Sequence, residues 1–362
     1  MKKQNLNRYM IDRLVIRVKG CSNISTKNLQ LAEQVCDKFI YHIFYDADSN
    51  NPAFLKVTFD KGAEKVKIEG SIRKWYLGMF SLEDLTAEQF KHSIERIAKI
   101  LDISMEKLMN GTITQCEIGL NVRTRIPADK VNENVRGYKQ YKYYRYNFET
   151  VGFLGESIKI KLYDKCCELT DNFKRYDTNN EAKRRFEKLK EQGIYTLRIE
   201  FTLKDERSFS DAKLEHLHTI GGLIENFYDT IPFFANMCSK LEIGMNVNFN
   251  DERINKDEYA ILVGAYHQGV LEFSEEYANR SLIKKNNKGI KIGRSASTSK
   301  TKARNYVNSI INKYTPPKSY HANQFRIDIY KTLKFNYGDS PQTSMREMIR
   351  TLLGLQSRIN IT

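Results

Sequence analysis

Four segments of this chain alternate regularly between apolar and polar side chains. They cover residues 66–73, 114–123, 158–163 and 196–204. Successive side chains of a β-strand point to opposite faces, so a period of two indicates a strand with one buried and one exposed side. Each such strand must bury its apolar side against a core. We therefore expect an antiparallel sheet with one polar face at the centre of the fold.

The polar side of the third segment carries a tyrosine among lysines. Tyr163 stands there with Lys159 and Lys161, and Lys165 is next in line. Three ammonium groups favour a phenolate over a phenol, and they also attract phosphate. A solvated basic strand without any function would have the same residues, so this segment alone does not decide between the two readings.

Each of the other three segments places one glutamate on its polar side, namely Glu69, Glu117 and Glu200. If the four strands share one sheet, these carboxylates and the Tyr163 hydroxyl share one face. Clustered carboxylates repel one another and raise each other's pKa, so such a group needs a cation. Oxygen ligands suit Mg²⁺ or Mn²⁺. A divalent ion beside a tyrosine in basic surroundings indicates phosphoryl transfer from nucleic acid to the phenol oxygen.

Four short motifs follow one another in the first two thirds of the chain. They are Met-Ile-Asp-Arg-Leu-Val-Ile-Arg at residues 10–17, the acidic strand at 116–123 with Pro127, Tyr-Asp-Lys at 163–165 with Glu-Leu at 168–169, and Arg-Ile-Glu at 198–200 continuing to Lys204. In this order they resemble the motifs of rolling-circle replication initiators of filamentous phages and related plasmid Rep proteins. The resemblance implies a Rep/relaxase-like nicking domain that spans roughly residues 10 to 210.

The resemblance also implies an activity and its partners. Tyr163 would attack one strand of origin DNA, single-stranded or supercoiled duplex, leaving a 5′-phosphotyrosyl link and a 3′-OH primer. Glu117 and Glu200, with Glu69, would hold Mg²⁺ or Mn²⁺, and Lys165 would stabilise the developing charge. A host helicase and polymerase would act on the nicked product. The resemblance also allows for a homodimer.

Several side chains are candidates for DNA contact. Lys159, Lys161 and Arg198 would position the strand through its phosphates, which carry no sequence information. Aromatic and basic residues interleave over residues 138–148, and we expect Tyr141 and Tyr143 to stack on bases. The alternative for this stretch is a β-hairpin with tyrosines packed across its strands.

The composition is that of a basic globular protein. Lys and Arg number 59 among 362 residues, against 44 Asp and Glu, which gives a net charge of +15. Such an excess favours a nucleic-acid partner over a membrane. No apolar run approaches the ~20 residues of a spanning helix, and the amino terminus does not resemble a signal peptide. We therefore expect a protein of the bacterial cytoplasm with no membrane partner.

The strand pattern stops after residue 240. We predict an α+β nicking domain over residues 1–240 and a smaller, mainly helical, basic DNA-binding or accessory domain over residues 241–362. Helical spacing also predicts helices over residues 28–40 and 211–227, and Thr86 with Gln89 predicts a capping box before another helix. The pair His216 and His218 falls on the helix at 211–227. Because residues i and i+2 diverge on a helix, we do not expect these histidines to bind one metal.

Two other functions remain open. A metal-dependent DNA nuclease could use water, with Tyr163 only structural, and its Tyr163→Phe variant would still cut DNA. A non-enzymatic DNA- or RNA-binding regulator would keep all its activity in a Glu200→Gln variant.

Overall fold

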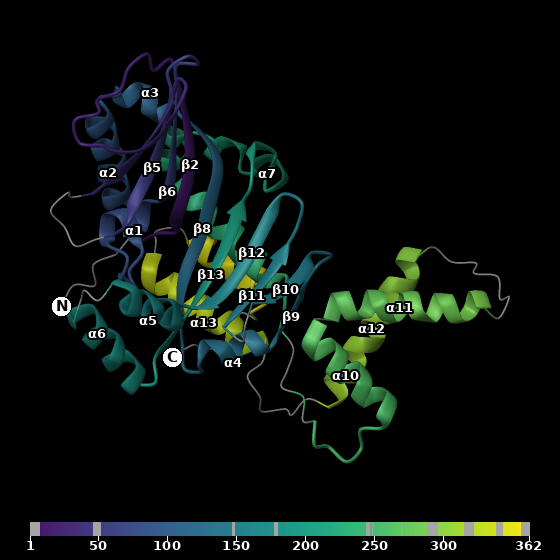
Figure 1. Ribbon diagram of the computed structural model, residues 1–362. Coiled ribbons are helices and arrows are strands. Elements are labelled where there is room, and N and C mark those ends of the chain that lie inside the picture. Colours follow the sequence, from purple (N-terminus) through teal and green to yellow (C-terminus); the bar gives the residue numbers. More distant parts are fainter. Residues whose placement is uncertain are drawn as a thin grey trace.

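The protein is a mixed α and β structure built on a large antiparallel sheet (Figure 1). The computed structural model describes residues 8–45, 52–146, 149–176, 180–243, 247, 249–268, 270–287, 296–314, 322–337 and 343–355. Within these residues ten strands form one sheet in the order β10-β11-β12-β13-β8-β2-β6-β5-β4-β3. The strands are β2 (Ile11–Lys19), β3 (Gln30–Val35), β4 (Lys38–Phe44), β5 (Phe54–Asp60), β6 (Lys65–Ser71), β8 (Thr112–Thr124), β10 (Lys142–Tyr146), β11 (Thr150–Leu154), β12 (Ile158–Asp164) and β13 (Tyr195–Leu203).

The four alternating segments correspond to β6, β8, β12 and β13, so their prediction as strands of one sheet is confirmed. Two short ladders lie outside this sheet: β1 (Arg8–Tyr9) pairs with β7 (Leu85–Thr86), and β9 (Val135–Tyr138) pairs with β14 (Leu241–Ile243). Residues 72 and 73, expected at the end of a strand, instead begin helix α1 (Ile72–Leu77). Ser71 ends the strand and caps this helix by accepting a hydrogen bond from the Lys74 amide.

Helices cover the apolar face of the sheet. In α2 (Ala87–Leu101), Phe90, Ile94 and Ile97 are fully buried, and burying each such side chain contributes ~1.5–3 kcal/mol. The predicted capping box of Thr86 and Gln89 is present at the start of this helix. The other helices of the first 243 residues are α3 (Met105–Met109), α4 (Ala128–Glu133), α5 (Lys165–Tyr176), α6 (Asn180–Glu191), α7 (Glu206–Asp211), α8 (Ile220–Glu225) and α9 (Thr230–Ser239), with 3₁₀ turns η1 (Glu215–Leu217) and η2 (Phe227–Asp229).

The opposite face of the sheet is polar and reaches solvent. Arg13 and Arg17 of β2 are exposed, and Lys67, Lys159 and Lys161 of β6 and β12 are half-buried. Strands β8, β13 and β12 present this face to the viewer in Figure 1, with α13 (Ala322–Tyr337) behind them. Helices therefore cover the apolar side, while the basic residues Arg13 and Arg17 on the other side reach solvent.

The expected division at residue 240 is wrong for the last two helices. Helices α10 (Lys256–Gln268), α11 (Val270–Asn287) and α12 (Ala296–Lys313) have a small core of their own, and they lie beside the sheet (Figure 1). By contrast, α13 and α14 (Thr343–Leu352) return to the main core, where Phe325, Ile329 and Leu353 are buried. Helical periodicity shows which side of a helix is apolar, but not against which core that side packs. Of the helices that the structure describes, none has both the length and the apolar character needed to cross a bilayer.

The helix expected over residues 28–40 is a β-hairpin instead. Strands β3 and β4 pair there, with Cys36 in the turn at a φ of 51°. The apolar side chains Leu31 and Val35 are more than half exposed, so their helical spacing reflects no buried face. Pairing of β4 with β5 buries Tyr41 and Ile43, and this tertiary contact outweighs the local helical preference.

The placement of α13 generates a stability test. Ile329→Ala should lower the free energy of unfolding by about 2–5 kcal/mol, because it opens a cavity in the main core. Trp75 is the only tryptophan and is fully buried in that core, so its fluorescence during urea denaturation reports the unfolding of the sheet. Met348→Ala, at an exposed position of α14, serves as the control. An unchanged Trp75 midpoint in Ile329→Ala would show that α13 folds apart from the sheet.

Candidate active site

Cross-strand pairing brings the polar residues of three strands into rows. Tyr163 of β12 lies opposite Arg198 of β13, which in turn lies opposite Asn121 of β8. The next row contains Lys161, Glu200 and Gly119. Residues directly opposite one another in an antiparallel pair share a face, so the alternation placed Tyr163 and Glu200 correctly on one side of the sheet.

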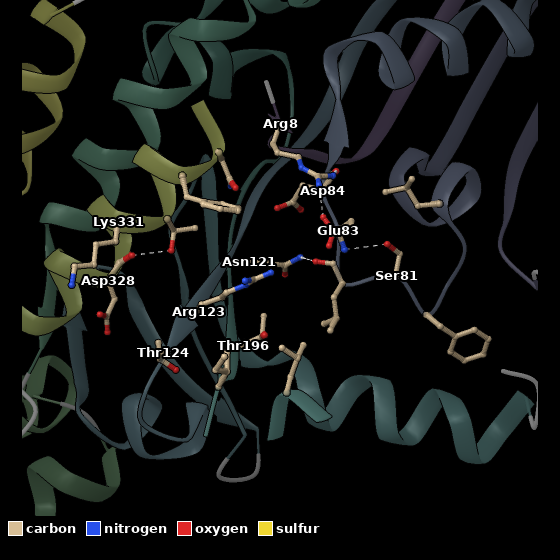
Figure 2. A pocket seen from close by; sticks show the side chains of 18 of the residues that line it. Arg8, Ser81, Glu83, Asp84, Asn121, Arg123, Thr124, Thr196, Asp328 and Lys331 are labelled. Carbon is tan, nitrogen blue, oxygen red and sulfur yellow. Dashed lines mark hydrogen bonds and ion pairs between the residues drawn. The ribbon is translucent and has the colours of Figure 1, made fainter. Parts of the chain in front are cut away.

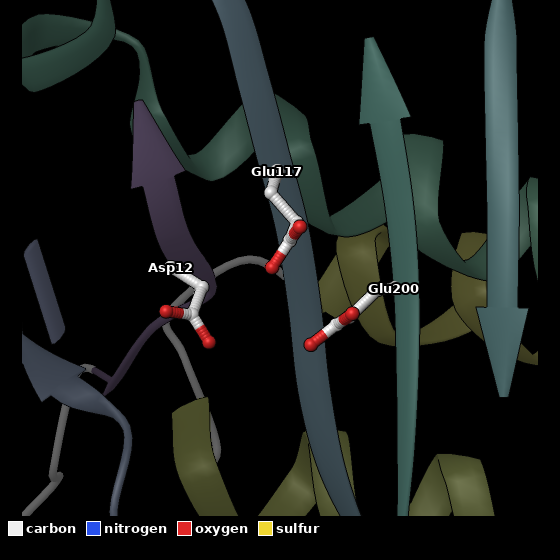
Figure 3. A group of neighbouring side chains, drawn as sticks. All are labelled: Asp12, Glu117 and Glu200. Carbon is white, nitrogen blue, oxygen red and sulfur yellow. The ribbon is translucent and has the colours of Figure 1, made fainter. Parts of the chain in front are cut away.

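Three carboxylates from neighbouring strands form the acidic centre of this face. Oxygen atoms of Asp12, Glu117 and Glu200 all lie within 4.8 Å of one another. Figure 3 shows the three side chains converging from β2, β8 and β13. Glu117 and Glu200 are two of the ligands predicted from the sequence. Asp12 was not predicted.

A β-bulge turns Asp12 toward this centre. Ile11 opposes Ile118 and Leu14 opposes Cys116, so both residues between them, Asp12 and Arg13, stand opposite Glu117 alone. An extra residue of this kind changes which face the following side chains take. On a regular strand, residues two apart share a face, so Asp12 would lie in the apolar core with the buried Leu14. The one available signal was the presence of an aspartate at an otherwise apolar position, since buried Asp is rare without a partner.

Glu69, the predicted third ligand, does not belong to this acidic centre. It lies opposite Val15 and Lys56, and its carboxylate pairs with Lys67. Partial burial opposes ionisation, but the Lys67 and Lys56 ammonium groups lower the pKa of Glu69. Lys67 and Lys56 therefore balance the charge of Glu69 at a position on β6 that lies outside the acidic centre. The alternation identified its face correctly but not its position along the strand.

Arg198 holds two of the three carboxylates in place. This side chain is fully buried, and its guanidinium donates hydrogen bonds to Glu200 (3.2 Å), Asp84 (2.7 Å) and Asp12 (2.8 Å). Arg73 of α1 donates a further bond to Asp12 over 3.0 Å. The prediction that Arg198 contacts DNA is thus wrong, because a buried arginine with three carboxylate partners presents no surface to a phosphate.

A glycine makes this arrangement possible. A Cβ atom at Gly119 would lie 2.5 Å from Nη2 and 2.9 Å from Cζ of Arg198, so only a residue without a side chain leaves space there. The guanidinium lies across β8 at this point and reaches Asp12 on β2. Gly119 is therefore part of the construction of the acidic centre.

Glu117 is the carboxylate of this centre that forms no ion pair with a described residue. It is half-buried, and no hydrogen bond or ion pair links its carboxylate to any residue in the described part of the chain. Burial, followed by the negative charges of Glu200 and Asp12, raises the pKa of Glu117 well above its usual range. A cation at this point would remove both penalties. Three convergent carboxylates with only oxygen donors fit Mg²⁺ or Mn²⁺.

Tyr163 lies directly beside the acidic centre. Its hydroxyl donates a hydrogen bond of 2.8 Å to Oε1 of Glu200, while only 7% of the residue is exposed. Lys161 Nζ lies 4.3 Å from the centre of the ring and Lys165 Nζ lies 5.8 Å from it. Burial, followed by the Glu200 charge, raises the pKa of Tyr163 well above its usual range. Both causes favour the neutral phenol over the expected phenolate, and Glu200 is placed to accept its proton.

Lys165 lies under this tyrosine at the start of α5. It is fully buried and paired with Glu168, which also accepts a hydrogen bond of 2.7 Å from Lys74. Burial, followed by repulsion from Arg73, lowers the pKa of Lys165 to about 8. Although burial of Glu168 acts in the opposite direction, Lys165 and Lys74 lower the pKa of that carboxyl to about 2. Lys165 thus places a positive charge near the phenol ring at neutral pH, and this charge is lost as the pH rises above about 8.

The candidates for DNA contact divide into two groups. Lys159 and Lys161 are half-buried on the polar face, as expected. The prediction that Tyr143 stacks on bases is wrong, because this side chain is buried against Phe153. Tyr141 is half-buried and packs on Tyr138.

The ring on the correct face is Tyr144, which the sequence analysis passed over. It covers Gly152, with 2.1 Å between its Cζ and the place of a glycine Cβ, and Lys159 Nζ lies 5.9 Å from the ring centre. Strand alternation from Lys142 would have separated Tyr143 from Tyr144.

The two histidines set aside in the sequence do not converge. His216 pairs with Asp229 over 2.7 Å, and the His218 ring packs against Phe209. The continuous helix expected over 211–227 is divided into η1, α8 and η2. His216 and His218 are not part of any metal-ligand group that the described residues form.

The unbalanced carboxylate predicts an unusual stability effect. A raised folded-state pKa means that the folded protein holds its proton more tightly than the unfolded chain, so stability falls as the pH rises through that pKa. Glu117→Gln should therefore raise the melting temperature at pH 7 in the presence of a chelator. Mn²⁺ should raise the melting temperature of the original protein, more at pH 8 than at pH 6, and should leave Glu117→Gln unchanged.

The neighbouring carboxylate should behave in the opposite way. Asp12→Asn removes the carboxylate that Arg73 contacts and one of the three carboxylates that Arg198 contacts, and it should cost about 3–5 kcal/mol of unfolding free energy. Glu69→Gln is the matched control, since loss of a partly exposed pair costs ~0–1 kcal/mol. Equal destabilisation by Glu117→Gln, Asp12→Asn and Glu69→Gln would show that Glu117 and Asp12 do not differ in how their charges are paired.

Comparisons with known proteins add no relative to this picture. No protein-family model, curated protein or solved structure matches the chain. The functional conclusion therefore depends on the geometry of the acidic centre and of Tyr163.

Proposed function

We propose that this protein is a replication initiator with a Rep/relaxase-like nicking domain, which cuts one strand of origin DNA by transesterification at Tyr163. The observation that carries the proposal is the hydrogen bond from the Tyr163 hydroxyl to Glu200, within an acidic group that also contains Asp12 and Glu117. A nucleophile, a base and an acidic cation site thus meet on one face of the sheet. The motif order in the sequence supports the same assignment.

The chain's own groups account for the proton and the new bond. The Tyr163 oxygen forms a bond to the scissile phosphorus, and its proton passes to Glu200 over the existing hydrogen bond. The bond from phosphorus to the 3′ oxygen breaks, and this oxygen leaves as a hydroxyl after taking up the proton that Glu200 accepted. The products are a 5′-phosphotyrosyl link and a free 3′-OH, from which a host polymerase would extend with the help of a helicase.

The cations around Tyr163 suit this reaction. Lys161 is half-buried and lies beside the ring, where it can meet a phosphate oxygen, while Lys165 supplies charge from beneath. A divalent cation held by Asp12, Glu117 and Glu200 would supply positive charge at the phosphoryl oxygen. Arg198 keeps Glu200 in position for the phenol proton, so it is a positioning residue.

The open face supports a polyanionic substrate. Arg13, Arg17 and Lys67 extend its basic character from β12 across to β2 and β6. Backbone phosphates would bind such a surface with little dependence on sequence, and the affinity would fall steeply with salt. The net charge of +15 is consistent with this use.

One observation favours a second candidate, a metal-dependent nuclease that uses water. Tyr163 is 93% buried and holds its proton firmly, as a structural hydrogen-bond donor to Glu200 would. In that case Glu200 and Glu117 would position and deprotonate a water molecule, and Tyr163 would only orient Glu200.

A covalent-capture experiment separates these functions. Supercoiled plasmids with randomised inserts are incubated with the protein and Mn²⁺, and DNA attached to protein is recovered under denaturing conditions and sequenced. We expect attached DNA with one enriched junction sequence, and complete loss of attachment in Tyr163→Phe. Tyr144→Phe is the matched control, because Tyr144 is a second tyrosine on the same face. Burial, followed by the nearby Glu200 charge, raises the pKa of its phenol.

The remaining outcomes contradict the proposal in different ways. Nicked plasmid without attached protein, persisting in Tyr163→Phe, would establish the water-using nuclease. Absence of cutting in every variant, with binding that depends only on salt, would favour a regulator of nucleic acid.

A further inference from the structure

A cleft of about 940 Å³ opens beside the acidic centre. Its walls come from the loop at residues 77–84, the ends of β8 and β13, helix α6 and helix α13. Figure 2 shows Asn121 and Arg123 in the middle of this cleft, with Asp84 on one side and Lys331 on the other. None of the proposed chemistry uses these residues directly.

Two contacts connect the cleft to the acidic centre. Asp84 lines the cleft, and its carboxylate accepts the 2.7 Å hydrogen bond from Arg198. Asn121 lies opposite Arg198, which lies opposite Tyr163, so two strand spacings separate Asn121 from the nucleophile, or ~10 Å between Cα atoms. A chain bound at Tyr163 therefore reaches the cleft within a few bonds.

The cleft contains an exposed aromatic ring next to uncommitted cations. Phe335 of α13 is 64% exposed, and the Arg123 guanidinium lies 5.8 Å from the centre of its ring. Arg123, Arg125 and Lys331 are exposed and form no ion pair within the described ranges of the chain. An apolar ring in water beside positive charges is the arrangement on which unpaired bases stack while phosphates meet the cations.

A buried acceptor in the same cleft lacks a donor. Asn121 is only 9% exposed, and its Nδ2 donates a hydrogen bond of 2.9 Å to the Leu82 carbonyl. Its Oδ1 atom is buried and has no hydrogen-bond partner among the described residues. Leaving a buried acceptor unpaired is costly, so this oxygen indicates a ligand that brings an N–H group. The base edges of nucleic acid carry such groups.

We infer that the cleft binds an unpaired nucleotide of the same DNA strand that Tyr163 cuts. The base stacks on Phe335 and donates an N–H to Asn121, while the flanking phosphates contact Arg123 and Lys331. The inference rests on the proposed function for the identity of the strand. It goes beyond that function by assigning a second, base-dependent contact away from the scissile phosphate.

Binding to oligonucleotides with and without bases tests this inference. Fluorescence anisotropy compares single-stranded oligo(dA) with an abasic strand of equal length, which keeps the phosphates. We expect Phe335→Ala to weaken binding of oligo(dA) roughly fivefold or more and to leave abasic binding unchanged. Arg123→Gln should weaken both and reduce the dependence of affinity on salt by about one phosphate contact.

Controls separate this result from failure of the fold or of the proposed function. Tyr306→Ala removes an exposed ring from α12, outside the cleft, and should bind both strands as the original protein does. Unchanged Trp75 emission shows that each variant is folded. If the original protein forms no covalent adduct but shows the Phe335 effect, the proposed function is refuted while the cleft is supported.

Two outcomes would overturn the inference. Equal loss of oligo(dA) and abasic binding in Phe335→Ala, or no loss of either, would show that no base enters the cleft. Competition by free dAMP at the same nucleotide concentration as oligo(dA) would assign the cleft to a free nucleotide rather than to the strand.

Discussion

The buried guanidinium of Arg198 is the interaction on which the rest of the site depends. It connects Asp12 on β2, Glu200 on β13 and Asp84 in the loop before α2, which are far apart in the sequence. A charge without solvent must be fully paired, so each of these carboxylates is confined to one position. The space for the guanidinium exists because residue 119 is glycine. A side chain there would collide with the guanidinium and displace it from Asp12.

The same pairing explains the chemical state of the other groups. Arg198 and Arg73 balance Asp12, Asp84 and Glu200 in part, but they leave Glu117 without a partner among the described residues. The surplus negative charge raises the pKa of both Glu117 and Tyr163, although burial is the larger cause for each. A cation at Glu117 would act on both groups at once. Under the proposed function, binding of the ion and activation of the phenol would therefore be coupled by charge.

The alternation of apolar and polar residues determines how much of the site could be predicted from the sequence. Alternation identifies the face of a strand, so it identified β8, β12 and β13 and placed Tyr163 with Glu200. It carries no information on register, which is why Glu69 was assigned to the acidic centre although it lies opposite Val15, further along β2. It fails at a bulge, so Asp12 was missed. Nor does it give exposure, and Arg198 and Tyr143 were therefore assigned to DNA although the structure buries both.

The cleft and the acidic centre adjoin for a reason that only the assembled sheet contains. Tyr163, Arg198 and Asn121 occupy one cross-strand row, and α13 closes the outer end of that row from a distant part of the sequence. Asp84 belongs to both places, because it lines the cleft while it balances Arg198. An anionic ligand in the cleft would compete with Asp84 for the positive charge of Arg198. It would thereby affect the side chain that holds Glu200 in place. If both proposals hold, substrate binding in the cleft and proton transfer at Tyr163 share the guanidinium of Arg198.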